Sequence, residues 1–223
     1  MRLAAGAASH HGWLKPYLTD SADEINEGVD HGKKVLVEGT QGFGLSLYHS
    51  TVYPKTTSRD TSVAGCISEC GISPRLVTDI VMVLRTFPIR VAGQQAGPMY
   101  EEIDWETVQR ESGYPTPLAE FTTVTGKLRR VARFDFDLAR HAIKVNRPTE
   151  LALNFLDYLD YRNRRAADRL DLTESTKAFL ENVEKELGVH VGFAGVGPSL
   201  SETMRIEETT IESQELCSPG YVR

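Results

Sequence analysis

Four short polar segments of this 223-residue sequence carry side chains that suit the binding of a phosphorylated ligand. The first, residues 38–44, contains three glycines around Gln41, and glycine lets a ligand approach the backbone closely. The second, residues 53–61, is dense in hydroxyl groups, which can donate to phosphate oxygens. Taken singly, the first segment suits an ordinary tight turn equally well, and hydroxyl-rich loops such as the second are usually solvated turns.

The third and fourth segments add charged groups. Residues 125–130, Thr-Gly-Lys-Leu-Arg-Arg, place guanidinium groups on a loop hinged at Gly126, which suits capture of a carboxylate or a phosphate. Residues 154–160 follow an apolar run and deliver Asp157, an acceptor for the amino and ring N–H edge of a purine, and a glycine-rich turn at residues 195–199 belongs with them. A solvated basic face is the commoner explanation for a run such as the third, and one acidic acceptor is a weak sign by itself.

The charge balance limits the partners. A net charge of −6 and a pI near 5.6 argue against a broad surface for nucleic acid or anionic membrane, so phosphate recognition must be local. No run approaches the roughly 20 apolar residues of a membrane span, and the first residues lack the order of a secretory signal, so a cytoplasmic protein is expected. Cys66, Cys70 and Cys217 do not have the spacing of a disulfide framework or a zinc site, and the pair His10-His11 lacks a spaced partner, so no metal site is predicted.

The elements that must position these segments alternate along the chain. Apolar periodicity and capping residues predict helices at residues 21–31, 73–84, 104–111, 135–146 and 173–187. Apolar runs predict strands at residues 35–37, 89–91, 151–156 and 189–193. This alternation favours an α/β fold with a largely parallel sheet flanked by helices, and ligands at the carboxyl ends of its strands. We expect one domain over residues 1–223, with a mobile tail at about 209–223.

Taken in order, the four segments resemble the adenylosuccinate synthetase family over about residues 34–204. Glu-Gly-Thr-Gln-Gly at 38–42, continuing to Tyr53-Pro54 and Thr57-Ser58, is similar to the family's Glu-Gly-Ala-Gln-Gly…Tyr-Pro…Thr-Ser pattern. Residues 125–130 resemble its Thr-Gly-Arg-x-Arg-Arg loop, and residues 154–160 its Thr-Lys-Leu-Asp-x-Leu-Asp strand end. The resemblance implies a fold related to P-loop NTPases and a GTP-dependent ligase that joins aspartate to IMP in AMP biosynthesis.

The resemblance also implies roles for individual residues. The IMP-binding residues would be Gln41, Leu45, Thr57, Val91 and Lys127; the aspartate-binding residues Thr125, Gly126 and Arg129; and the GTP-binding residues Asp157, Gly195, Gly197 and Pro198. Two positions depart from the family pattern. Lys127 stands in place of an arginine, which loses the bidentate fork. Phe155 stands in place of the lysine that packs on the base, which leaves GTP or ATP open as the donor.

The family's Gly-Asp-Glu-Gly-Lys-Gly phosphate loop has no counterpart in this sequence. That loop carries the base and a ligand of Mg²⁺, the cofactor that the resemblance implies, so the catalytic residues are unknown and the chain alone is expected to be a poor catalyst. A homodimer, or a partner that supplies the amino-terminal part, is expected. Three alternatives stay open: a non-catalytic nucleotide-binding module, a subunit of a split enzyme, and a variant acting on a guanine nucleotide.

Overall fold

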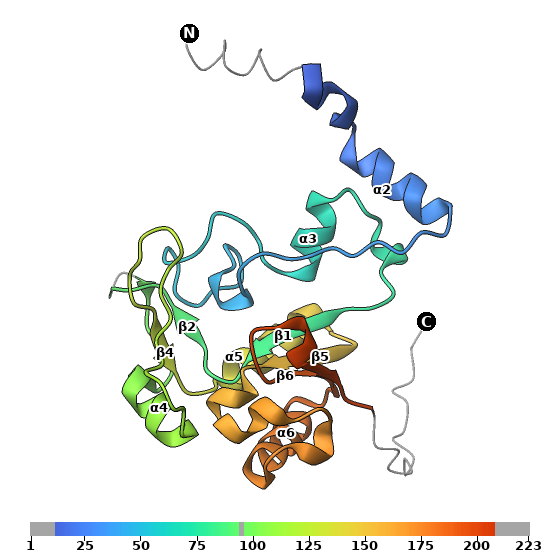
Figure 1. The fold of residues 1–223 in the computed structure, drawn as a ribbon. Coiled ribbons are helices and arrows are strands. Elements are labelled where there is room, and N and C mark those ends of the chain that lie inside the picture. Colours follow the sequence, from blue (N-terminus) through green and yellow to red (C-terminus); the bar gives the residue numbers. More distant parts are fainter. Residues whose placement is uncertain (1–11, 94–95, 208–223) are drawn as a thin grey trace, which may run out of the picture. The chain divides into compact units, whose positions relative to one another are not determined.

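The computed structural model describes residues 12–93 and 96–207 (Figure 1). The described residues form two compact units that divide between Thr78 and Asp79. The single domain expected over residues 1–223 stays a prediction. The pair His10-His11, Cys217 and the tail at 209–223 lie outside the described residues. No helix in the described ranges is long and apolar enough to cross a membrane.

The first unit is built from helices and long loops. Its elements are η1 (Lys15–Tyr17), α2 (Ser21–Asp30), η2 (Phe43–Leu45), α3 (Val63–Glu69) and η3 (Pro74–Leu76). Helix α2 begins as the sequence predicts, because the Asp20 carboxylate accepts hydrogen bonds from the amides of Ala22 and Asp23. Ser62 begins α3 in the same way, through a bond from the Gly65 amide.

The predicted strand at residues 35–37 is wrong. The segment is extended but unpaired, and the Leu36 side chain is 94% exposed. A strand is stable only beside another strand, and the described part of the first unit contains none. The apolar run by itself therefore could not specify a strand.

The second unit contains a four-stranded sheet in the order β1-β5-β6-β7, of which Figure 1 labels β1, β5 and β6. The strands are β1 (Val81–Arg85), β5 (Glu150–Asn154), β6 (Val191–Gly195) and β7 (Thr203–Arg205). The first three run parallel and β7 is antiparallel, which confirms a largely parallel sheet. Within the described residues β1 and β7 are the two edge strands, and β1 carries exposed valines, Val81 at 43% and Val83 at 63%.

Helices α5 (Phe136–Asn146) and α6 (Glu174–Leu187) pack on this sheet. Both begin and end where their capping residues predict, α5 after Asp135 and α6 between Thr173 and Gly188. The core between sheet and helices is buried, and its largest fully buried side chains are Leu151, Leu153, Leu156, Leu180 and Ile206. Short 3₁₀ turns connect these elements. Between β5 and α6 lie η5 (Leu156–Tyr158), η6 (Tyr161–Arg165) and η7 (Arg169–Asp171), and between β6 and β7 lies η8 (Leu200–Glu202).

A small antiparallel sheet was not expected from the sequence. Its strands are β2 (Ile89–Arg90), β4 (Arg130–Ala132) and β3 (Glu102–Ile103), in that order. Helix α4 (Trp105–Ser112) packs against it, burying Trp105 and Val108 with Val131. This sheet carries the basic loop.

The predicted helix at residues 73–84 is wrong. A short 3₁₀ turn is followed by strand β1, because the run Ile80-Val81-Met82-Val83 is rich in β-branched residues and β5 is available to pair with it. The helical spacing of its apolar residues was outweighed by this pairing.

Candidate functional site

In the first unit, three of the residues assigned to IMP lie on loops that hydrogen bonds tie together. Gln41 adopts a φ of 63°, a left-handed conformation that a side chain rarely takes outside functional or strained sites. The Thr57 amide donates to the Leu45 carbonyl at 2.8 Å, and the Thr61 hydroxyl donates to the Gly42 carbonyl at 3.0 Å. The structure thus brings Gln41, Leu45 and Thr57 into one loop cluster.

Asp60 holds this loop cluster in place. Its carboxylate accepts from the hydroxyls of Ser46 at 2.9 Å and Ser62 at 2.6 Å, and from the Ser62 amide at 3.0 Å. Burial acts to raise the pKa of Asp60, but these hydrogen bonds outweigh it and the pKa lies below its usual value. Asp60 is therefore a structural anion, and sequence reasoning grouped it only with solvated hydroxyls.

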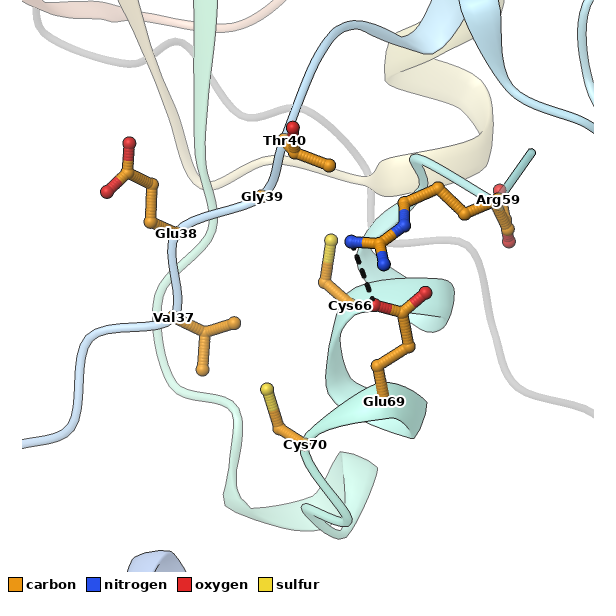
Figure 2. A pocket seen from close by; sticks show the side chains of 9 residues that line it. Val37, Glu38, Gly39, Thr40, Arg59, Cys66, Glu69 and Cys70 are labelled. Atoms are coloured by element: carbon orange, nitrogen blue, oxygen red, sulfur yellow. Dashed lines mark ion pairs between the residues drawn. The ribbon is translucent and has the colours of Figure 1, made fainter. Parts of the chain in front are cut away.

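A small cavity of about 70 Å³ lies beneath residues 37–40 (Figure 2). The thiols of Cys66, in α3, and of Cys70, directly after it, face this cavity, and Arg59 and Glu69, which form an ion pair, also line it. Burial and neighbouring carboxylates raise the pKa of the Cys66 thiol, which stays protonated near neutral pH. The cavity is too small for a nucleotide, since ligand pockets run to roughly 300 Å³ or more.

In the second unit, the carboxyl ends of β1 and β5 meet at a strained residue. Phe155 follows β5 with a φ of 69°. Its carbonyl accepts from the Thr86 hydroxyl at 2.7 Å, and the Thr86 amide donates to the Asn154 carbonyl at 3.1 Å. The guanidinium of Arg85 stacks on the Phe155 ring. Strain of this kind is maintained by surrounding structure and concentrates at ligand sites.

Asp157 is 2% exposed and forms the centre of this cluster. Its Oδ2 accepts from the Tyr114 hydroxyl at 2.9 Å and lies 3.8 Å from Nη1 of Arg164, whereas Oδ1 has no hydrogen-bond partner among the described residues. Burial raises the pKa of Asp157, against the opposing effects of Tyr114 and Arg164. The cluster thus holds a buried acceptor with one unsatisfied oxygen.

The turn after β6 closes on the same cluster. A Cβ at Gly195 would lie 2.3 Å from the Asn154 amide oxygen, and one at Gly197 would lie 2.5 Å from the Glu202 carboxyl carbon, so either substitution would displace a side chain of this cluster. Glu202 pairs with Arg164, which connects the turn to Asp157. The structure therefore brings Asp157, Gly195 and Gly197 together, and Pro198 is exposed beside them.

The basic loop is a short hairpin that precedes β4. Gly126 has a φ of 60°, a left-handed conformation that favours glycine, and the Thr122 and Thr125 hydroxyls bond each other at 2.6 Å. Arg129 donates from Nε to the Phe121 carbonyl at 3.4 Å, and Lys127 is exposed. Arg90 is opposite Arg130 in the β2–β4 ladder, so Val91 and Arg129 are the next residues at the same end.

Glu120 joins the hairpin to the strand-end cluster. Its carbonyl accepts from the Arg129 amide at 2.7 Å, and its carboxylate accepts from Arg85 and, at 3.3 Å, from the Tyr158 hydroxyl. Sequence reasoning missed Arg85, Thr86, Glu120 and Tyr114. Assigning residues 80–84 to a strand would have placed Arg85 at a strand's carboxyl end.

No cluster of three or more His, Cys, Asp or Glu side chains in residues 12–93 and 96–207 could hold a metal ion. The described residues therefore do not form a cage for the Mg²⁺ that the resemblance implies, and none of them is assigned to it.

Comparisons with known proteins agree with these motifs. Residues 3–165 match the family model described as adenylosuccinate synthetase. The adenylosuccinate synthetase of Thermococcus sibiricus is 43% identical over 195 residues, covering 87% of this chain and 55% of the relative. That of Methanococcus aeolicus is 39% identical, covering 86% and 55%. The chain thus spans about half the length of the curated relatives it matches.

Two solved structures are similar. A fully ligated adenylosuccinate synthetase from Plasmodium falciparum superposes with a TM-score of 0.77 at 21% identity, over 89% of this chain and 56% of that one, which supports the fold alone. A succinoaminodeoxyadenylate synthetase from cyanophage S-2L, bound to dGMP and to dATP as an energy donor, superposes with a TM-score of 0.63 at 26% identity, over 82% and 49%. On the matched residues and the shared fold, the chain belongs to the adenylosuccinate synthetase family.

Proposed function

We propose that this chain carries the nucleotide and aspartate sites of an adenylosuccinate synthetase, a GTP-dependent ligase of AMP biosynthesis that joins aspartate to IMP. One observation supports this most directly: Asp157, buried at the carboxyl end of β5, keeps one carboxylate oxygen without a partner. A buried acceptor in that state costs free energy unless a ligand donates to it. The carboxyl ends of parallel strands are also where such ligands bind.

In this proposal, each of three groups of residues binds one ligand. The IMP site comprises Gln41, Leu45, Thr57, Val91 and Lys127; the aspartate site Thr125, Gly126 and Arg129; and the GTP site Asp157, Gly195, Gly197 and Pro198. GTP phosphorylates the purine oxygen of IMP, and the aspartate amine then displaces that phosphate. These residues bind and orient the reactants, and Arg129 receives a carboxylate of aspartate through charge-assisted hydrogen bonds.

The phosphate loop, the base and Mg²⁺ belong, in this proposal, to a partner polypeptide or to a further segment of the enzyme, and the assembly works as a homodimer in the cytoplasm. Mg²⁺ commonly binds through substrate phosphates and one or two carboxylates, so the nucleotides themselves would bring part of its coordination.

Calorimetric titration of the full 223-residue chain tests the proposal. Gln41→Ala should weaken IMP binding about tenfold and leave GTP binding unchanged, because the proposal assigns Gln41 to the IMP site and Asp157 to the GTP site. Asp157→Asn should do the reverse. Asp137→Asn is the matched control, since Asp137 is a 92% exposed carboxylate on α5. Binding of neither nucleotide by the folded parent chain, or equal binding by parent and both variants, would refute the proposal.

A further inference from the structure

The two carboxylate oxygens of Asp157, in the strand-end cluster, differ in their hydrogen bonding, and the proposed function does not explain this difference. Oδ2 is engaged by Tyr114, at 2.9 Å, and faces Arg164. Oδ1 is equally buried and has no partner among the described residues. The protein therefore supplies a hydrogen-bond donor to Oδ2 and leaves Oδ1 as the one carboxylate oxygen available to a ligand.

Tyr114 reaches Asp157 from an exposed segment and not from the sheet. It follows Gly113, which ends α4 with a φ of 69°, and residues 115–117 beyond it are exposed. Its backbone is held by two long bonds to Gln109, at 3.3 and 3.4 Å. Its ring packs edge-on against Tyr161, with centroids 4.6 Å apart. The hydroxyl is thus delivered to Asp157 by packing, on a segment hinged at a glycine.

We propose that Tyr114 determines which purine the donor site prefers, by occupying the oxygen of Asp157 that a two-donor base edge would need. This inference rests on the proposed function. Guanine presents two adjacent donors, N1–H and the N2 amino group, which match the two oxygens of one carboxylate. Adenine presents one amino donor beside an acceptor nitrogen. A single available oxygen satisfies adenine's edge but leaves one donor of guanine unpaired, and an unpaired buried donor loses affinity.

The expected consequence is that the donor site binds guanine and adenine nucleotides with similar affinity. The cyanophage S-2L relative, which was solved with dATP as an energy donor, has a related fold, so an adenine donor is compatible with this architecture. Phe155 is compatible with the same consequence, because an aromatic ring whose one face is covered by Arg85 can offer its other face to either purine without reading the edge of the base.

Three nucleotides that differ in the hydrogen-bond donors of their base serve as probes: GTP, ITP, which lacks the N2 amino group, and ATP. Each is titrated calorimetrically into the full chain and into Tyr114→Phe, which keeps the ring and removes the hydroxyl. The parent should bind GTP and ITP within about threefold of each other. Tyr114→Phe removes the hydroxyl that donates to Oδ2 and that accepts from Arg164 at 3.1 Å, and it leaves Arg164 held by Glu202. Oδ2 then becomes available to the N2 amino group, and GTP should gain roughly tenfold over ITP, the value of one added charge-assisted hydrogen bond.

Two controls make the result specific. Tyr161→Phe removes a hydroxyl from the same aromatic cluster, one that makes no hydrogen bond to Asp157 in the described structure, and should leave the GTP/ITP ratio unchanged. In an Asp157→Asn background the effect of Tyr114→Phe should vanish, because the coupling runs through that carboxylate. An unchanged GTP/ITP ratio in a folded Tyr114→Phe protein overturns this inference and leaves the proposed function standing. Failure of the parent to bind any of the three nucleotides overturns both.

Discussion

The guanidinium carbon of Arg85 lies 3.7 Å from the centroid of the Phe155 ring, so that the last residue of β1 covers the first residue after β5. Arg85 also pairs with Glu120, and both side chains are largely buried, at 25% and 21% exposed. A single arginine therefore connects the strained Phe155 to the segment that leads into the basic loop.

Arg85→Met keeps the length of the side chain and removes its charge. The free energy of unfolding should fall by about 1–3 kcal/mol, because Glu120 is left without its cation and the ring without its guanidinium. Urea denaturation measures the change. Adding Glu120→Gln should recover part of the loss, and a fully additive double variant would show that the two side chains are not coupled.

Asp157→Asn should change the pH dependence of stability. Burial raises the pKa of Asp157, so the folded protein binds this proton more tightly than the unfolded chain does. In the parent, protonated Asp157 contributes to the free energy of unfolding at acid pH. This contribution is lost as the pH rises from the ordinary aspartate pKa, about 4, through the higher pKa of the folded protein. The stability of Asp157→Asn relative to the parent should therefore rise across that window and then level off. Thermal melts between pH 4 and 8 on the two proteins test this, and a constant difference would contradict it.

Two helix glycines should respond in opposite directions to alanine. A Cβ at Gly65 in α3 would lie 2.8 Å from the Asp60 carbonyl, so Gly65→Ala forces the Asp60 loop to shift and should destabilise the chain. A Cβ at Gly28 in α2 meets nothing closer than 3.8 Å, so Gly28→Ala should stabilise it by roughly 0.5–1 kcal/mol. Chemical denaturation of both variants measures the two changes in the free energy of unfolding. Equal changes would mean that the Asp60 loop shifts without cost to make room for the new methyl group.

Arg129→Ala should weaken binding of aspartate by roughly tenfold to a hundredfold, because a paired guanidinium–carboxylate contact is worth about 1–3 kcal/mol. Lys127→Ala should do less, since an exposed lysine offers only a point charge. Arg130→Ala should lower stability more than binding, because its guanidinium pairs with Glu102 and donates to the Gly97 carbonyl at 2.7 Å. Calorimetry with the three folded variants, together with the partner polypeptide if one is identified, separates them, and unaltered affinity in Arg129→Ala would make the loop an ordinary basic surface.

Local sequence signals predicted the elements whose ends carry their own caps. Helices α4, α5 and α6 begin after Asp104, Asp135 and Thr173, where a side chain or loop conformation fixes the start irrespective of the rest of the fold. The motif order likewise predicted Asp157, Gly195 and Gly197 at or just after the ends of strands, where the structure has them, and their binding roles stay a prediction.

The strands at 151–156 and 189–193 were predicted from their apolar runs and are present as β5 and β6, but two other apolar segments were assigned wrongly because their structure depends on whether a distant partner is available. Residues 35–37 and 80–84 are both short apolar runs, yet only the second has a strand to pair with. The contacts of Asp157 come from Tyr114 and Arg164, which no spacing rule connects to it. Such contacts follow from tertiary packing, which local periodicity does not encode.

The outer position of β1 has a practical consequence for handling the protein. An edge strand with exposed valines at residues 81 and 83 offers unpaired backbone groups and β-branched side chains to another copy of the chain. Natural sheets protect such edges with lysine, which resists desolvation when two edges meet. Val83→Lys should therefore raise the concentration at which the purified chain begins to aggregate, as followed by light scattering, and so enlarge the range in which its ligands can be measured at all.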